Sequence, residues 1–190
     1  MENLQQEIDN SVNILKQGKV ILYPTDTIWG IGADATNSKA VQRIYKIKER
    51  DAGKSMIILL DSMEKLSDYV EDVPEISYDL IEKTRVPLTI VYPKAKNLAK
   101  NLVAADGSIA IRVVKGAYCS EVIRKFGKPI VSTSANMSGD KPPKTFNDIS
   151  QMVIDRVDYV VNVFRNRINT VKPSTIIKMG DDGMFEIIRS

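Results

Sequence analysis

The chain contains no histidine and a single cysteine, Cys119. Without histidine it cannot carry a Ser-His-Asp or Cys-His catalytic arrangement, or a zinc ion held by imidazole groups. One cysteine excludes a disulfide within the chain and a metal site built from several thiolates. We therefore expect no metal site made by the protein. Any catalysis must use lysine, arginine, hydroxyl, amide or carboxylate groups, or a metal that arrives with the substrate.

The chain also lacks a long apolar run. None approaches the roughly 20 residues that a membrane-spanning helix requires, and residues 1–6 are polar, unlike a signal peptide. We therefore predict a cytoplasmic protein without membrane association. The net charge is only +3, which allows a nucleotide or nucleic acid as a partner without requiring one. With 190 residues, 43% of them hydrophobic, residues 1–190 are predicted to form a single domain.

Segments with helical spacing of apolar residues alternate with short apolar runs, and this alternation predicts the fold class. We predict helices at residues 4–15, 41–48, 74–81, 121–126 and 145–153, with Asn37 or Ser38, Pro74 and Thr145 at the starts of three of them. We predict strands at residues 20–23, 55–60, 88–92, 108–113, 129–132, 159–163, 175–179 and 184–188, the last two joined by a hairpin turn. The pattern favours an α/β fold with a single-domain, twisted, open mixed sheet and flanking helices.

A polar segment, residues 23–34, follows the first predicted strand. Ligands bind at strand ends in open α/β sheets. Here Thr25 and Thr27 offer hydroxyl groups, and Asp26 offers a carboxylate. The alternative interpretation is an ordinary polar turn beside a packed Trp29.

Two further segments could bind an anion. Residues 46–54 contain four cations that together would form a patch of phosphate size: Lys46, Lys48, Arg50 and Lys54. The alternative is a solvated helix end, where positive charge is favoured in any case. Residues 132–139 follow a predicted strand and could form a nest of backbone amides, or an ordinary turn. Neither a Walker motif nor Gly-x-Gly-x-x-Gly is present.

Arg112 stands out within the predicted strand 108–113. Strand alternation places Ile109, Ile111 and Val113 on one face and Arg112 on the other. If both faces of the sheet are covered, this arginine needs either an anionic ligand in a cavity or an internal salt bridge. The sequence leaves both possibilities open.

Taken in order, these segments resemble the YrdC-like family of threonylcarbamoyl-AMP synthases over about residues 20–189. The matching pieces are residues 23–27 with 30–33, Lys48-x-Arg50, residues 110–113, residues 132–136 with 138–139, residues 173–176, and Arg189. Each piece alone is weak, whereas six in one order are specific. Because the chain stops at Ser190, the resemblance is to the short, single-domain form of the family.

The resemblance implies a fold built around a basic cavity, and it implies roles for individual positions. A catalytic tetrad around the nucleotide falls on Lys48, Arg50, Ser134 and Asn136. Further nucleotide-binding positions fall on Lys54, Ser108 and Arg189. The positions that bind L-threonine fall on Thr27, Arg112, Ser132 and Ser174.

The implied reaction joins L-threonine, bicarbonate or CO2, and ATP into threonylcarbamoyl-AMP and pyrophosphate, for the N6-threonylcarbamoyladenosine modification of tRNA. It needs no protein nucleophile, because the carbamate of threonine attacks the α-phosphate directly. Mg²⁺ is expected to arrive on the ATP phosphates. A downstream tRNA-modifying transferase is the implied partner, together with weak binding of tRNA itself.

Another class of function is an RNA-binding or ribosome-maturation module that uses a basic concave face. Four phenylalanines, one tryptophan and a charge of +3 argue against it. A relative that has lost synthesis is disfavoured by the intact tetrad.

The chain departs from the family pattern at three places. Asp51 replaces a proline that often follows Lys-x-Arg, and Val86 to Thr89 reduce the usual Pro-Gly-Pro-x-Thr. Many members also carry a histidine beside the amino acid, at about the position of Leu59. These changes bear on the shape of the threonine pocket.

Overall fold

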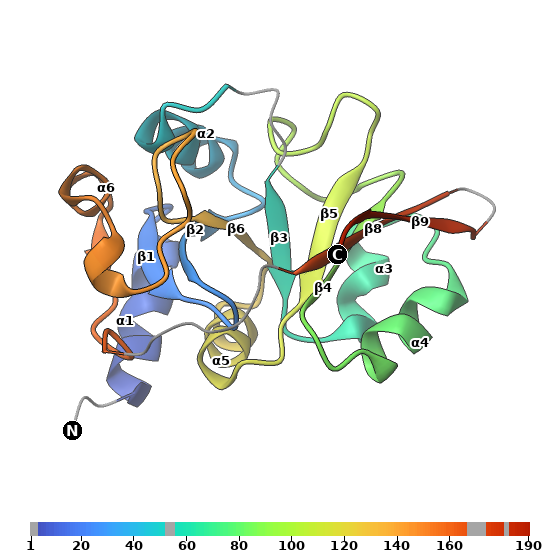
Figure 1. Ribbon diagram of the computed structural model, residues 1–190, viewed down its shortest axis with the longest axis horizontal. Helices are drawn as coiled ribbons and strands as arrows, with labels where there is room; N and C mark the ends of the chain where they lie inside the picture. Colours follow the sequence, from blue (N-terminus) through green and yellow to red (C-terminus); the bar gives the residue numbers. More distant parts are fainter. Residues whose placement is uncertain (1–3, 52–55, 167–173, 181–182) are drawn as a thin grey trace.

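The computed structural model describes residues 4–51, 56–166, 174–180 and 183–190 (Figure 1). Its helices are α1 (Leu4–Lys16), α2 (Ser38–Lys48), η1 (Met63–Lys65), α3 (Leu66–Tyr69), α4 (Glu75–Lys83), α5 (Ala117–Phe126), η2 (Phe146–Asp148) and α6 (Gln151–Arg156), the two labelled η being 3₁₀ turns. Its strands are β1 (Ile21–Pro24), β2 (Trp29–Asp34), β3 (Ile57–Leu60), β4 (Leu88–Tyr92), β5 (Ile109–Val113), β6 (Ile130–Ser134), β7 (Tyr159–Val160), β8 (Thr175–Met179) and β9 (Phe185–Arg189).

The described strands form one sheet in the order β7-β1-β2-β6-β3-β5-β4-β8-β9. Three neighbouring pairs are parallel, namely β1–β7, β3–β5 and β4–β8, and the others are antiparallel. The sheet is therefore open and mixed, which confirms the predicted fold class.

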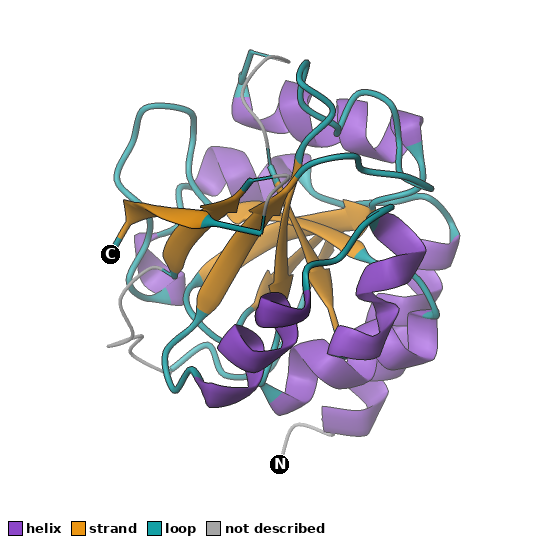
Figure 2. Cartoon of the chain, turned by 90° about the vertical axis from the view of Figure 1, so that its right-hand side faces the viewer, coloured by secondary structure: helices purple, strands orange, loops and turns teal. Residues whose placement is uncertain are grey.

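Helices cover both faces of this sheet (Figure 2). On one face α1 packs against α5, and their apolar residues form a cluster with Ile21, Leu59 and Ile130 of the sheet. On the other face the larger apolar cluster joins α2, α3, α4 and α6 to residues such as Ile58 and Ile111. Because side chains alternate between the two faces along each strand, the sheet contributes residues to two separate cores.

Local signals in the sequence explain where the first two helices begin and end. Gly18 adopts a left-handed φ of 70° just after α1, and this conformation favours glycine. The side chain of Asn37 accepts hydrogen bonds from the backbone N–H groups of Lys39 (3.0 Å) and Ala40 (3.2 Å). Asn37 is therefore the N-cap of α2, one of the two predicted candidates.

Strand β2 was not predicted, because its sequence reads as a polar, glycine-containing loop. It pairs with β1 as a hairpin, Tyr23 lying opposite Gly30. A Cβ on Gly32 would lie 2.6 Å from the ring of Tyr23, so the glycine here makes room for an aromatic side chain. Trp29 is buried and packs on Phe146, with ring centroids 4.9 Å apart, which agrees with the alternative of a packed tryptophan.

Three other predictions need correction. Thr145 caps the short turn η2 rather than the following helix, and Ser150 caps α6 by accepting from Val153 N–H. Residues 161–163 lie beyond the end of β7. The strand predicted at residues 55–60 begins only at Ile57, and residue 55 lies outside the described residues. Among the described residues, no helix is long and apolar enough to cross a membrane.

Candidate active site

One face of the sheet is covered by helices at one end and open at the other. Leu59 of β3 and Ile130 of β6 belong to the cluster under α1 and α5. Two residues away, Ile57 and Ser132 point to the same side and line a cavity. Arg112 pairs with Leu59 in the parallel register of β5 and β3, so it projects from this face too. Because side chains alternate along the strands, Ile57, Arg112 and Ser132 lie on the same face and form the floor of the cavity.

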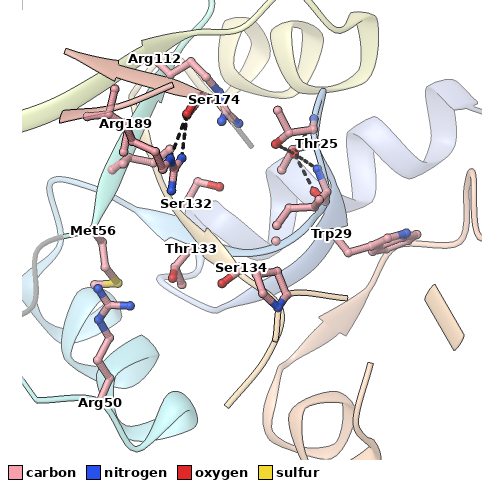
Figure 3. A pocket seen from close by; sticks show the side chains of 16 residues that line it. Thr25, Trp29, Arg50, Met56, Arg112, Ser132, Thr133, Ser134, Ser174 and Arg189 are labelled. Atoms are coloured by element: carbon pink, nitrogen blue, oxygen red, sulfur yellow. Dashed lines mark hydrogen bonds between the residues drawn. The ribbon is translucent and has the colours of Figure 1, made fainter. Parts of the chain in front are cut away.

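The cavity has a volume of about 320 Å³. Three arginines line it, together with hydroxyl groups from the β1–β2 turn, β6 and the start of β8: Arg50, Arg112, Arg189, Thr25, Thr27, Ser132, Thr133, Ser134 and Ser174 (Figure 3). None of the described residues that line it carries a carboxylate on its side chain. The cavity is thus suited to a ligand with several negative charges and hydroxyl groups.

The side chains divide into two groups along the cavity (Figure 3). Arg112 and Arg189 lie near Ser174, whereas Arg50 lies apart, beside Met56. Arg189 donates from Nη2 to the carbonyl oxygen of Ser174 at 2.8 Å and from Nε to the same oxygen at 3.2 Å. Arg189, predicted to bind the nucleotide, therefore contacts Ser174, predicted to bind threonine. The two expected subsites are thus adjacent.

The turn between β1 and β2 is held by the hydroxyl of Thr25. Its Oγ1 accepts from the backbone N–H groups of Thr27 (3.0 Å) and Ile28 (3.1 Å). The hydroxyl of Thr27 lies 3.0 Å from that of Thr25 and also lines the cavity. The polar turn between β1 and β2 therefore also forms part of the cavity surface.

Arg112 forms an internal salt bridge and lines the cavity as well. Its Nη2 donates to Oδ1 of Asp26 at 2.9 Å, and the two side chains are 5% and 13% exposed. The internal salt bridge, one of the two alternatives left open by the sequence, is thus present, and the same side chain also borders the cavity. Asp26 is absent from the predicted site residues, although the polar turn that contains it was singled out.

Lys48 occupies a different place from the one predicted. It was expected in a surface patch at the end of a helix, but only 1% of the residue is exposed and it does not line the cavity. Its Nζ donates to the carbonyl oxygens of Ser134 and Asn136, so the ammonium lies beneath the loop that follows β6. Helical spacing turns Lys48 inward with Val41 and Ile44.

Burial, together with the nearby positive charge of Arg50, lowers the pKa of Lys48 to about 8. Above that pH the folded chain releases a proton that the unfolded chain, with the ordinary lysine value of 10.5, still holds. The contribution of Lys48 to the free energy of unfolding therefore rises as the pH increases from about 8 to 10.5.

We expect the wild type to gain about 2 kcal/mol of unfolding free energy over Lys48→Met between about pH 7 and 9.5. The reason is that methionine fills the site without a titrating group, so the buried charge is penalised only in the wild type at the lower pH. Chemical denaturation of both proteins across this range measures the difference, in which other titrating groups cancel. Parallel stability curves for the two proteins would contradict the expectation.

The remaining predicted residues are placed as follows. Asn136 does not line the cavity; its amide donates to the carbonyls of Met137 (2.9 Å) and Asp140 (2.8 Å). Ser108 does not line the cavity, and its hydroxyl donates to Asp106 at 2.6 Å. Lys54 lies outside the described residues.

The structure also adds lining residues that the sequence did not single out. Met56 and Ile57 from the start of β3, and Ile176 from β8, give the cavity an apolar wall. Their neighbour Leu59 is fully buried and does not line the cavity, so the position where many family members carry histidine belongs here to the core. Periodicity identified these residues as strand, but it could not show which of them border empty space.

Among the described residues, no group of three or more carboxylate or thiol side chains is placed to hold a metal ion. Cys119 is buried, and burial raises the pKa of its thiol well above the ordinary value. Within the described part of the chain, the charged groups that line this cavity are the three arginines.

Comparison with known proteins gives a consistent picture. The chain matches the Sua5/YciO/YrdC family, described as "Telomere recombination", over residues 13–190. It is 35% identical to the threonylcarbamoyl-AMP synthase of Pseudoalteromonas translucida over 161 residues, which cover 83% of this chain and 86% of that protein.

Solved structures are similar as well. P. abyssi Sua5, complexed with L-threonine, aligns with a TM-score of 0.83 at 26% identity over 90% of this chain. This chain corresponds to 50% of that Sua5 chain, about half of its length. E. coli YciO shares the fold with a TM-score of 0.84 over 98% of this chain and 89% of its own, at 24% identity. From the match over residues 13–190 and these relatives, the chain belongs to the Sua5/YciO/YrdC family.

Proposed function

We propose that this chain is an L-threonylcarbamoyladenylate synthase, which makes threonylcarbamoyl-AMP and pyrophosphate from L-threonine, bicarbonate or CO2, and ATP. The observation that carries the proposal is the cavity in which Arg50, Arg112 and Arg189 meet several hydroxyl groups without a lining carboxylate. A relative that is 35% identical to this chain is named threonylcarbamoyl-AMP synthase. The product would serve a downstream transferase that modifies tRNA.

The nucleotide is assigned to the end of the cavity that holds Arg50 and Ser134. An arginine can bind two phosphate oxygens with its planar guanidinium group. Lys48 and Asn136 support this end from behind, because both hold the loop after β6 through backbone carbonyls. Mg²⁺ would arrive with ATP and stay on its phosphates.

The amino acid is assigned to the end that holds Arg112, Ser132 and Ser174, with Thr27 beside them. L-Threonine has a carboxylate and a hydroxyl, and these match a guanidinium group and the surrounding hydroxyls. P. abyssi Sua5, to which this chain is similar, has been solved in complex with L-threonine, which supports threonine as the amino acid.

The chemistry fits these residues. The threonine amine and bicarbonate form a carbamate with loss of water, and a carbamate oxygen then attacks the α-phosphate while pyrophosphate leaves. The protein has to position the two substrates and balance the charge of the transition state, which arginine and hydroxyl groups can do. No histidine is required for either task.

The test is a pyrophosphate assay with the pure chain. We expect release of pyrophosphate when ATP, bicarbonate and L-threonine are all present, without tRNA, and loss of the signal when any one is omitted. Mass spectrometry of the product should show threonylcarbamoyl-AMP. Pyrophosphate release that requires RNA would instead favour the RNA-binding class of function, and no release under any condition would overturn the proposal.

A further inference from the structure

Asp26 has no role in the proposed reaction so far, yet it is partly buried, with its side chain 13% exposed, beside an arginine that lines the cavity. It lies in the turn between β1 and β2, next to Thr25, whose hydroxyl fixes the backbone of that turn. Its carboxylate accepts a hydrogen bond from Arg112 at 2.9 Å. Among the described residues, Asp26 is the acid that pairs with Arg112, and Arg112 Nε is buried without a hydrogen-bond partner. The orientation of the guanidinium group therefore depends on Asp26.

A second contact fixes Asp26 itself. Gly116, the N-cap residue of α5, lies against it so closely that a Cβ on Gly116 would be 3.1 Å from Asp26 Cβ. Gly116 has an ordinary φ of −86°, so glycine is required there for space and not for backbone freedom. The start of α5 has no side-chain cap, and a carboxylate near a helix N-terminus is favourable.

We infer that Asp26 is a positioning residue, which holds the Arg112 guanidinium in the orientation that binds the amino-acid carboxylate. The inference rests on the proposed function, because it assigns Arg112 to the amino-acid end of the cavity. An arginine that is nearly buried and paired on one edge cannot rotate freely, so its remaining donors keep a fixed direction. Gly116 contributes to the same arrangement, because a Cβ at this position would press on Asp26 Cβ and require a shift of a few tenths of an ångström.

Two variants test this inference through different physical changes. Asp26→Asn keeps an oxygen acceptor but removes the charge, and Gly116→Ala keeps the charge but pushes Asp26 by a few tenths of an ångström. Asp158→Asn is the matched control. Asp158 is 16% exposed and pairs with Arg43 at 2.7 Å, but Arg43, unlike Arg112, does not line the cavity.

In the pyrophosphate assay, Asp26→Asn should raise the KM for L-threonine by about 10- to 100-fold, the scale for one charged hydrogen bond. The KM for ATP should stay within about threefold, because Arg50 and Ser134 are untouched. Gly116→Ala should shift the threonine KM in the same direction by a smaller factor, and Asp158→Asn should change neither constant. Equal changes in both KM values, or an unchanged threonine KM in folded Asp26→Asn, would overturn the inference.

A readout without substrate separates this inference from the proposed function. In protein labelled with ¹⁵N-arginine, the Nε–H signal of Arg112 is identified by its loss in Arg112→Lys. Its exchange with solvent should be slow in the wild type, because the group is buried, and at least about tenfold faster in Asp26→Asn. Unchanged exchange would overturn the positioning role. If the wild type makes no pyrophosphate, the proposed function fails while the exchange experiment still decides the role of Asp26.

Discussion

Replacement of Arg50 by alanine is expected to lower the rate of pyrophosphate formation by about 10²- to 10³-fold, the usual effect of removing one preorganised electrostatic group. Arg50 lines the end of the cavity assigned to the phosphates, apart from the other two arginines (Figure 3). Charge develops on the leaving pyrophosphate as the bond to the α-phosphate breaks, and a guanidinium group there stabilises that charge. The effect should fall mainly on kcat, because the interaction strengthens in the transition state.

The matched control is Lys46→Ala. Lys46 is an exposed cation at the same end of α2 and does not line the cavity. Its removal changes the net charge by the same amount, so it reports any general effect of charge on nucleotide binding. We expect a change of less than about threefold, the size of a surface effect. If both variants lose activity equally, the contact assigned to Arg50 is wrong and the effect belongs to the overall field of the basic helix end.

Much of the fold could be predicted because the relevant signals are local. Alternation in residues 109–113 places Arg112 opposite the isoleucines, and helical spacing in residues 41–48 identifies α2. The segment from Trp29 to Asp34 was missed, because its two glycines and the polar residues 25–27 that precede it suit a loop as well as a strand. Its identity as a strand comes from pairing with β1 and β6, which are distant interactions.

Part of the cavity lining could be predicted from the sequence, whereas its geometry could not. Arg112, Ser132 and Ser174 were named from motifs, and the structure gathers them around one cavity. Helical spacing places Lys48 on the same face of α2 as Val41 and Ile44, but the sequence alone could not show that it is buried, because a lysine at a helix end is normally solvated. Nor could it pair Asp26 with Arg112, since 86 residues separate them and only the sheet register brings them together.

L-Valine is expected to be a very poor substrate, with kcat/KM lower than that of L-threonine by about 10⁴-fold. The two amino acids have nearly the same shape, but valine carries a methyl group where threonine carries its hydroxyl. A buried polar site that has lost water to bind the hydroxyl leaves its own groups unpaired when valine binds. The hydroxyls of Thr27, Ser132 and Ser174 line the amino-acid end and are the candidates for this contact.

L-Serine should be rejected far less strongly, by about 10- to 200-fold, because it lacks only one methyl group. Met56, Ile57 and Ile176 supply the apolar wall against which that methyl could pack. The order threonine, serine, valine is therefore the expected order of kcat/KM in the pyrophosphate assay. It distinguishes a site that recognises the hydroxyl from one that selects only for volume.

Three variants locate the residue that recognises the hydroxyl: Thr27→Val, Ser132→Ala and Ser174→Ala. The one that makes the contact should reduce the preference for threonine over valine by at least about tenfold, while the other two leave the ratio nearly unchanged. Ser174 also lies 2.8 Å from the Thr89 hydroxyl, so Thr89→Val is the control for indirect effects at that position. If the wild type turns over valine as well as threonine, the cavity does not recognise the hydroxyl, and threonine is not the amino acid that this enzyme uses.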